Sequence, residues 1–398
     1  MTVERATVHG QPRLAITIAL CFLVALLEGV DLQAAGIVAP ELGGVFGLDR
    51  LQMGWVFSAG ILGLLPGALV GGWLADRIGR KRVLIGSVAL FGIFSLATAH
   101  AWGLGSLLVA RLFTGVGLGA ALPNLIALSS EAAGAHLRGR AVSLMYCGVP
   151  LGGALAAGIG IAGYSGGWQL VFHIGGVVPL LILPLLALYL PESSEFHKPS
   201  GQARDSRSLH RDLLGQGATW LLWISYFFTL MVVYILINWL PSLLVGQGFS
   251  ANHASWVMFA LQIGAAIGTL ALGMLMERLP AWCMATLVYL GILVALAGLG
   301  LADNLGAMLL AGFVAGFFAT GGQCVLYALT PCFYPARMRA TGVGAAVAVG
   351  RLGAMSGPLV AGQMLALGAG SAGVLLISAP GIVVAALALF RLITQRPA

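Results

Sequence analysis

Long apolar stretches alternate with short polar ones along the whole chain. Most contain roughly 20 apolar residues or more, the length a helix needs to cross the ~30 Å hydrocarbon core of a bilayer. The pattern therefore predicts twelve membrane-spanning helices. They are expected at residues 14–38, 51–75, 83–101, 104–129, 139–163, 168–190, 219–245, 253–276, 282–301, 305–333, 340–366 and 371–393.

Composition supports the same class of protein. Hydrophobic residues make up 59% of the chain and charged residues only 8%, whereas a soluble domain carries about 25% charged residues. We therefore expect an all-α integral membrane protein. The short polar N-terminus leads straight into a full-length span, which predicts a retained anchor rather than a cleaved signal peptide.

The positive charges are distributed unevenly around these spans. If the N-terminus is cytoplasmic, every Lys and Arg lies on the inner side except Arg50 in an outer loop and Arg111 and Arg351 within spans. The positive-inside rule then predicts that both termini are cytoplasmic. The net charge of +7 is explained by this topology, so nucleic acid is not an expected partner.

A polar stretch from Pro191 to Gly217 divides the spans six and six. We predict an N-terminal six-helix bundle over 1–190, a cytoplasmic linker over 191–218 and a C-terminal six-helix bundle over 219–398. A shift of 201 positions relates the two bundles, as in the repeats on which many secondary transporters are built. It aligns Gly72, Leu74, Asp76 and Arg77 with Gly273, Leu275, Glu277 and Arg278, and Gly115 with Gly316.

Four charged residues inside the spans break this repeat. At the same shift Glu28 meets Thr229, Asp31 meets Val232, Arg111 meets Gly312 and Arg351 meets Pro150. A residue needed to fold the repeat should tend to occur in both halves, whereas a residue that serves a single substrate needs to occur in only one half. Ionisable side chains at membrane depth are costly and usually functional, so these four are the candidate functional residues.

Glu28 and Asp31 lie three residues apart, hence on one helical face. At 1.5 Å per residue, Glu28 and Arg111 both lie ~20 Å from the inner boundary. This depth predicts that Arg111 pairs with Glu28. Two interpretations remain open: the carboxylates take up a proton, or a permanent ion pair joins the first span to the fourth.

Several motifs resemble those of a known family. Gly72-Trp-Leu-Ala-Asp76-Arg77-Ile-Gly79-Arg80-Lys81-Arg82 resembles the loop signature of the major facilitator superfamily. Arg111-Leu-Phe-Thr-Gly115-Val-Gly117-Leu-Gly119 is similar to its RxxxGxGxG motif, and Pro191-Glu192-Ser193 to its PES element. Glu28-Gly-Val-Asp31 resembles the DGxD motif of the aromatic acid:proton symporter branch, with Glu in place of the first Asp.

Longer stretches, such as Phe57–Gly67 and Gly350–Pro358, resemble phenylpropionate transporters of this branch. The resemblance implies proton-coupled import of an aromatic carboxylate, such as 3-(3-hydroxyphenyl)propionate or a related phenylpropionate, by alternating access. It also implies location in the bacterial inner membrane. The partners are then the small acid, protons and the lipid bilayer; we expect a monomer with no cofactor other than the coupling proton.

A carboxylate substrate needs a cation, and a planar guanidinium can bind it with two parallel hydrogen bonds. Arg351 is one candidate anchor and Arg111 the other; helix packing beside glycines is the alternative role of Arg351. The rest of the substrate needs an apolar pocket with few polar groups. Candidates, each of which could instead face lipid or pack, are Tyr226, Tyr234, Asn238, Gln262, Gln323 and Tyr327.

The charges at the cytoplasmic ends form a separate group. The positive-inside rule explains the basic residues among them, but not Asp76. The resemblance implies that Asp76 ties the second span to the start of the eleventh when the protein is open outward. The expected gate residues are Gly72, Asp76, Arg77, Arg80, Glu131 and Arg140.

Other function classes are less well supported. A proton-coupled exporter of aromatic acids or other small compounds remains the alternative. Gly148-Val-Pro150-Leu-Gly152-Gly153 matches the GPxxxGG-type motif of proton antiporters only in part, which mildly favours import. A membrane enzyme or receptor would need a nucleophile with a base, a histidine cluster or an output domain. None is evident, and the five cysteines lack metal-ligand spacing. We expect neither catalytic nor metal-binding residues.

Overall fold

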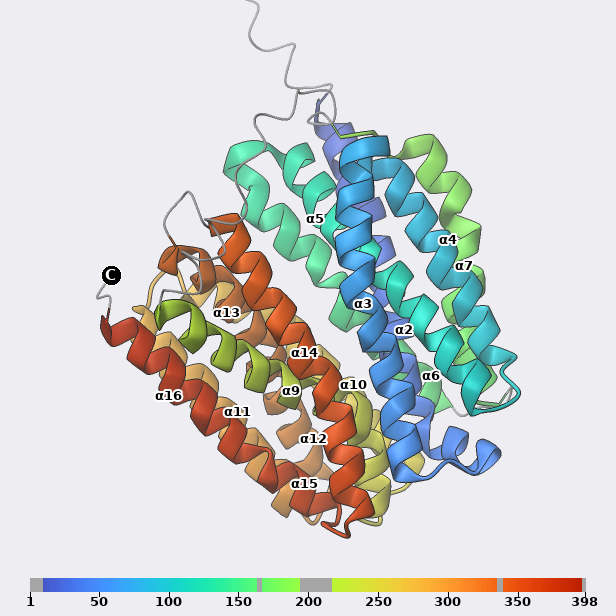
Figure 1. Cartoon of the computed structure of the whole chain (residues 1–398), viewed down its shortest axis with the longest axis vertical. Coiled ribbons are helices and arrows are strands. Elements are labelled where there is room, and N and C mark those ends of the chain that lie inside the picture. The colour runs from blue at the N-terminus through green and yellow to red at the C-terminus, as the bar shows by residue number, and fades with distance from the viewer. Residues whose placement is uncertain (1–9, 163–166, 194–216, 335–338, 396–398) are drawn as a thin grey trace, which may run out of the picture. The chain divides into compact units, whose positions relative to one another are not determined.

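The structure, a computed structural model, describes residues 10–162, 167–193, 217–334 and 339–395. Within them, twelve helices are long and apolar enough to cross a membrane, which confirms the predicted number. The first half contains α2 (Gly10–Phe46), α3 (Arg50–Ile78), α4 (Arg80–Ala99), α5 (Leu104–Tyr146), α6 (Gly148–Ala162) and α7 (Gln169–Tyr189) (Figure 1). Residues 194–216 of the predicted linker lie outside the described residues.

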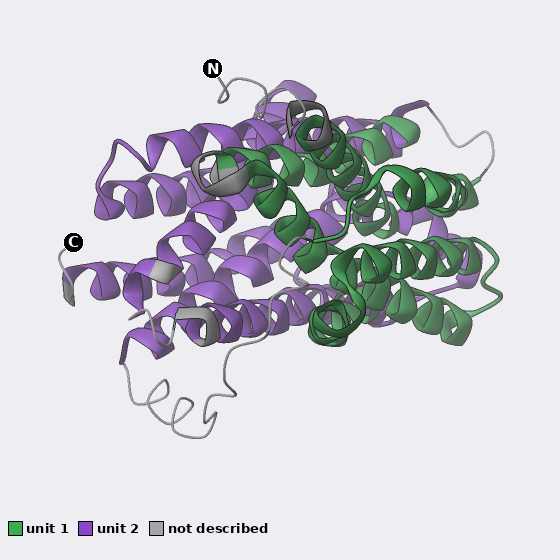
Figure 2. Cartoon of the chain, turned by 90° about the horizontal axis from the view of Figure 1, so that it is seen from above, with its two compact units in different colours: residues 1–35, 59–159, 164–199 green, residues 36–58, 160–163, 200–398 purple. Residues whose placement is uncertain are grey.

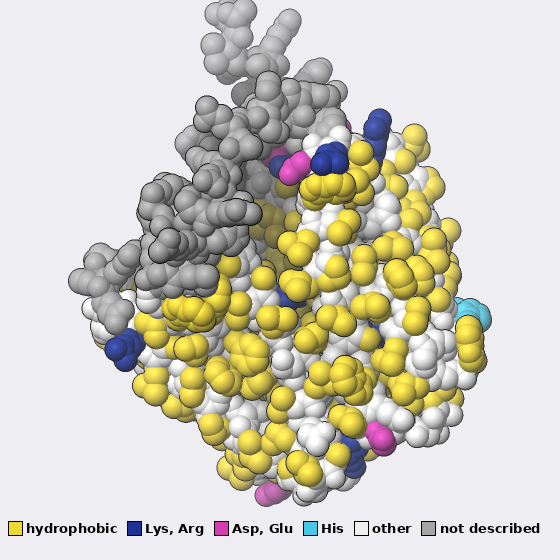
Figure 3. Space-filling model, viewed as in Figure 1, with side chains coloured by type: hydrophobic (Ala, Val, Ile, Leu, Met, Phe, Trp, Pro, Cys, Tyr) yellow, Lys and Arg dark blue, Asp and Glu magenta, His cyan; other side chains and the backbone are white. Residues whose placement is uncertain are grey.

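The second half begins at Gly217 and has more interrupted helices. It contains α9 (Gly217–Gly246), α10 (Ala251–Leu275), α11 (Ala281–Leu301), α12 (Leu305–Ala315), η1 (Gly316–Thr320), α13 (Gly321–Leu329), η2 (Thr330–Phe333), α14 (Arg339–Ala366), α15 (Ser371–Ile377) and α16 (Ala379–Gln395). Hydrophobic side chains cover most of the described surface in Figure 3, as expected for a surface in contact with lipid.

The first span is longer than predicted. Its expected end at residue 38 is wrong, because α2 continues through Pro40 to Phe46. A proline removes only one backbone donor from the helix. The helix ends at Gly47, whose φ of 60° is a left-handed conformation that glycine adopts without strain. The Leu48 N–H then donates to Gly43 O at 3.0 Å. The helix end is therefore determined by the backbone conformation at Gly47 and not by the point at which the apolar stretch ends.

The tenth span is not a uniform α-helix. Its middle, η1, is a π-helix between α12 and α13. A π-helical turn contains one residue more than an α-helical turn. It therefore changes the direction in which the side chains of α13 point relative to those of α12. The apolar pattern alone did not predict this turn.

The chain forms two compact units, coloured separately in Figure 2. Unit 1 comprises residues 1–35, 59–159 and 164–199, and unit 2 comprises residues 36–58, 160–163 and 200–398. The end of α2 and the beginning of α3 thus belong to unit 2, where Ser58 Oγ donates to Met355 O at 2.8 Å. The division into bundles at 1–190 and 219–398 stays a prediction.

Glycines bring helices of unit 1 close together. A Cβ atom added to Gly29 of α2 would overlap Val149 O, and one added to Gly152 of α6 would overlap Leu26 O. Helices in membranes associate largely through such close backbone approach at small residues. The contact with α6 occupies one face of α2, and the carboxylate of Asp31 lies on the opposite face.

We expect Gly152→Ala to destabilise the protein, because its methyl group would force α2 and α6 apart. Overpacking costs about 1–3 kcal/mol, which should lower the unfolding temperature by a few degrees. Gly158→Ala on the same helix is the matched control, since a Cβ atom there meets nothing within 4 Å. Thermal unfolding of the purified variants in detergent measures both; equal unfolding temperatures would contradict this account of the packing.

Candidate functional site

The centre of the candidate site is an ion pair buried in unit 1. Arg111 Nη1 on α5 lies 2.7 Å from Asp31 Oδ1 on α2, and the two side chains are 5% and 0% exposed. Arg111 Nη2 also donates to the backbone oxygen of Asp31 at 3.4 Å. Each charge stabilises the other in a region that water does not solvate.

Three helices besides α2 form the surroundings of this ion pair. The guanidinium carbon of Arg111 lies 5.6 Å from the centre of the Phe172 ring on α7. A Cβ atom on Gly60 of α3 would lie 3.5 Å from Arg111 Nη2, so a glycine lets α3 approach. Ser95 of α4 is fully buried and donates to Phe172 O at 3.2 Å.

The two predicted carboxylates occupy different positions. The depth argument predicted Glu28 as the ion-pair partner of Arg111, whereas the structure shows Arg111 paired with Asp31. The two carboxylates differ by only ~4.5 Å in height, less than the error of a depth counted from an apolar boundary. Glu28 is also buried, with 5% of its surface exposed.

Arg351 and Tyr234 form a polar contact in unit 2. Arg351 Nη1 on α14 donates to Tyr234 Oη on α9 at 2.9 Å. Tyr234 is buried and Arg351 is half-buried. Asn238 Nδ2, one turn further along α9, donates to Tyr234 O at 2.9 Å.

A second group of predicted pocket residues lies around α13. Gln323 Nε2 donates to Tyr327 Oη at 2.7 Å. The ring of Tyr327 lies 5.6 Å from that of the fully buried Tyr226, and Tyr226 Oη lies 2.7 Å from Thr330 Oγ1. Gln262 of α10 is buried, and its Nε2 has no hydrogen-bond partner among the described residues. Thr330 was not among the predicted pocket residues, because only the fold places it beside Tyr226.

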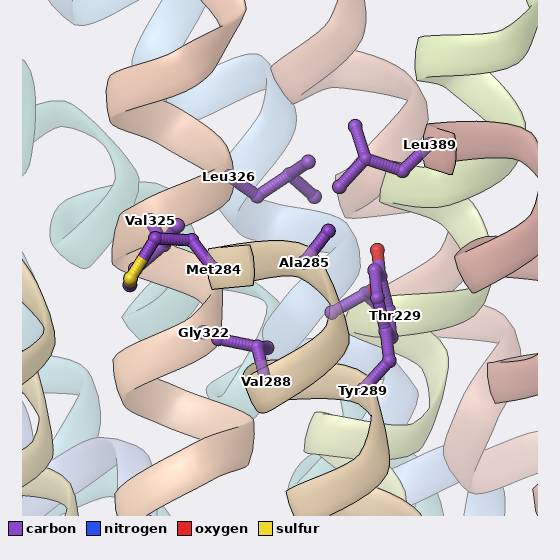
Figure 4. Close-up of a pocket in the computed structure, with 9 residues that line it drawn as sticks. All are labelled: Thr229, Met284, Ala285, Val288, Tyr289, Gly322, Val325, Leu326 and Leu389. Atoms are coloured by element: carbon purple, nitrogen blue, oxygen red, sulfur yellow. The ribbon is translucent and has the colours of Figure 1, made fainter. Parts of the chain in front are cut away.

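The small cavity in Figure 4 is distinct from these groups. It lies between α9, α11, α13 and α16, and none of the six predicted pocket residues lines it. Its walls include Thr229 and Tyr289, whose hydroxyl groups are 3.1 Å apart. The remaining walls are mostly apolar, and there is room for at most about one water molecule. The cavity cannot hold an aromatic acid.

The predicted gate residues separate into two groups. Arg80 forms an ion pair with Glu131, which accepts a hydrogen bond of 2.5 Å from Ser193 Oγ. Asp76, Arg77 and Arg140 are exposed, or nearly so, and a Cβ atom on Gly72 would meet nothing within 4 Å. The structure therefore joins Arg80 and Glu131, and the gating role of all six residues stays a prediction.

Glu192 of the PES element has a clear structural role. Its Oε1 accepts the Lys81 N–H at the start of α4 at 3.0 Å. A carboxylate there satisfies a free backbone donor and interacts favourably with the helix dipole. Gly79 has a φ of 100°, and a Cβ atom on it would overlap Glu192 Oε2. Glycine is required at this turn for both reasons.

Among the described residues, twelve helices are long and apolar enough to cross a membrane, and the charges of Asp31 and Arg111 are buried between them, which defines a polytopic membrane protein. The chain belongs to the Major Facilitator Superfamily, which it matches over residues 21–358 and again over 248–398. The predicted family and helical fold are thereby confirmed. The cytoplasmic location of both termini stays a prediction.

Similar proteins agree with this assignment. The chain is 65% identical to the 3-(3-hydroxy-phenyl)propionate transporter of Escherichia coli (strain K12), over 98% of this chain and 97% of that protein. It is 36% identical to the 4-hydroxybenzoate transporter PcaK of Pseudomonas putida, over 88% and 86%. A solved D-xylose-proton symporter shares the fold, with a TM-score of 0.79, 19% identity, and coverage of 94% and 97%.

We expect the Asp31–Arg111 pair to be energetically coupled. Breaking a buried pair by removing one partner typically costs about 3–5 kcal/mol, whereas replacing both by apolar groups is often nearly neutral. Arg111→Met alone should therefore lower the unfolding temperature in detergent more than Arg111→Met combined with Asp31→Leu. Arg82→Met, at an exposed arginine, is the control. Additive effects of the two single substitutions would contradict the coupling.

Proposed function

We propose that this protein is a proton-coupled symporter that imports an aromatic carboxylate across the bacterial inner membrane by alternating access. A phenylpropionate, such as 3-(3-hydroxyphenyl)propionate, is the proposed substrate. The observation that carries the proposal is the buried Asp31–Arg111 ion pair in a chain 65% identical to a transporter named for that acid. The chain's aromatic-acid relatives support the substrate class.

The proposed coupling follows from the electrostatics of the pair. An ionised Asp31 compensates Arg111, so the two charges stabilise one another in a region of low dielectric constant. A proton that binds Asp31 removes this compensation and leaves Arg111 as an uncompensated buried cation. That state is costly. Protonation therefore favours a conformation in which another anion, the Glu28 carboxylate or the substrate carboxylate, approaches the guanidinium.

Arg351 is the proposed anchor for the substrate carboxylate. Its Nη1 donates to the hydroxyl of Tyr234, and that hydroxyl can itself donate to an anion. A carboxylate bound by both groups would receive charge-assisted hydrogen bonds, which are roughly twice as strong as neutral ones. The aromatic side chains Tyr226 and Tyr327 on the same unit would supply the apolar surface for the ring.

Uptake by proteoliposomes tests the function directly. Labelled 3-(3-hydroxyphenyl)propionate should accumulate when the outside is more acidic, and accumulation should collapse when a protonophore removes the gradient. Glu28→Gln should abolish accumulation but leave some exchange of internal for external substrate, because exchange needs no net proton movement. Glu41→Gln, further along α2, is the matched control. Full accumulation by Glu28→Gln would exclude a role for Glu28 in proton coupling, either as a proton carrier or as the anion that approaches Arg111.

Binding of the acid and of its neutral amide can be compared to decide whether Arg351 anchors the carboxylate or packs between helices. Arg351→Gln should weaken binding of the acid by about 10- to 100-fold, the range expected for loss of hydrogen bonds to a charged group. Binding of the neutral amide of the same compound should change little. Arg351→Lys, which keeps the charge but loses the planar fork, should be intermediate. Equal losses for acid and amide would instead favour a helix-packing role.

A further inference from the structure

The two carboxylate oxygens of Asp31 have different surroundings. Oδ1 accepts the short hydrogen bond from Arg111 Nη1. Oδ2 is buried, and it has no hydrogen-bond partner among the described residues. A buried carboxylate oxygen without a partner is unfavourable while the group is ionised. Oδ2 is therefore the oxygen at which a proton would bind without competing with Arg111.

One polar side chain faces the same space as Oδ2. An atom at the Cβ position of Gly175 on α7 would lie 3.3 Å from Asp31 Oδ2 and 3.1 Å from Ser95 Oγ on α4. Both oxygens thus lie close to one point beside Gly175, where a side chain would crowd them. A rotation of the Asp31 carboxyl group would bring Oδ2 toward Ser95 Oγ. Ser95 is fully buried, so bulk water does not compete for this contact.

The direction of the existing Ser95 hydrogen bond determines what Ser95 can offer. Its Oγ–H donates to Phe172 O on α7 at 3.2 Å. A hydroxyl has one donor and two acceptor positions, so Ser95 has only lone pairs left for Asp31. A lone pair repels a carboxylate oxygen but accepts a hydrogen bond from a protonated one. While it keeps its bond to Phe172 O, Ser95 can accept a hydrogen bond from a protonated Asp31 but cannot donate one to the carboxylate, whereas Arg111 donates to Asp31 Oδ1.

We propose that Ser95 is a positioning residue for proton coupling, which accepts the hydrogen bond of the proton carried by Asp31 Oδ2. The inference rests on the proposed proton-coupled function. In the ionised state Asp31 is held by Arg111. In the protonated state Oδ1 still faces Arg111, and the Oδ2–H group is stabilised by Ser95. Because Arg111 stabilises the ionised carboxylate and Ser95 the protonated one, Asp31 can both bind and release a proton during one transport cycle.

Other charged and titratable groups lie on α2 and on the helices packed against it. On the helices packed against it, Arg111 lies on α5 and His173 on α7, two residues before Gly175, while His100 caps α4 with its ring 5.1 Å from that of His173. Glu28 lies on α2 itself, one turn away. The basic residues Arg80, Lys81 and Arg82 lie at the opposite end of α4 from His100. A change confined to Ser95 leaves all of these groups in place.

The test is the pH dependence of uptake by Ser95 variants in proteoliposomes. Initial rates of 3-(3-hydroxyphenyl)propionate uptake are measured over a series of external pH values, with the internal pH moved in parallel so that the gradient stays constant. Ser95→Ala removes the acceptor and should require a roughly three- to tenfold higher proton concentration for half-maximal uptake, a shift of about 0.5–1 pH unit toward acid. Ser95→Thr keeps the hydroxyl and should retain the wild-type midpoint.

Ser87→Ala is the matched control. Ser87 is a buried serine of the same helix whose hydroxyl donates to Val83 O, within α4 itself, so its loss should leave the pH midpoint unchanged. The midpoint does not depend on the amount of folded protein, so lower stability of a variant cannot imitate the shift. If Ser95→Ala does not fold, Ser95→Cys, with its weak sulfur acceptor, should shift the midpoint in the same direction.

The outcomes of this experiment separate the role of Ser95 from the proposed function. A wild-type protein whose uptake is indifferent to the proton gradient would contradict the proposed function and the inference together. A proton-driven wild type with an unchanged midpoint in Ser95→Ala would overturn the inference alone. A shift toward alkaline pH would also overturn it, because Ser95 would then be donating to the ionised carboxylate rather than accepting from the neutral one.

Discussion

The interaction on which the site depends is the buried ion pair between Asp31 and Arg111. In hydrocarbon, neither charge is tolerable alone, and even a well-made pair contributes little net stability compared with apolar packing. Such a pair is therefore poorly explained as a device for stability. We propose that its value lies in sensitivity: a single proton on Asp31 would change the electrostatic balance of the surrounding helices by more than a comparable event at an exposed surface.

The internal repeat shows how the two halves differ in chemistry. The position that corresponds to Glu28 holds Thr229, which is hydrogen-bonded to Tyr289, and the position that corresponds to Arg111 holds Gly312. A neutral hydroxyl pair thus occupies a place in unit 2 where unit 1 has ionisable groups. Unit 2 has a guanidinium, that of Arg351, beside the hydroxyl of Tyr234. Charge pairing in one unit and polar, aromatic groups in the other fit the division between proton coupling and substrate recognition that we propose.

Close helix packing and buried charge depend on one another in unit 1. Glycines at positions 29, 60 and 152 let neighbouring backbones approach α2 and Arg111. That approach excludes lipid and water and fixes which face of α2 carries Asp31 toward α5. Without it, a flexible arginine side chain could reach the membrane surface instead of the carboxylate.

The sequence by itself determined the membrane class, the twelve spans, the repeat and the four charged residues that interrupt it. Polar groups are very costly in hydrocarbon, so the lengths of apolar stretches and the positions of isolated charges carry structural information. Tertiary structure decided the partners. Counting residues predicted Glu28 opposite Arg111, but helix packing placed Asp31 there, since one turn of helix is smaller than the uncertainty in depth. Helix packing also brought Ser95 and Gly175 to Asp31, and a π-helical turn precedes Gln323 and Tyr327. Such contacts between residues distant in sequence depend on side-chain directions that an apolar pattern does not contain.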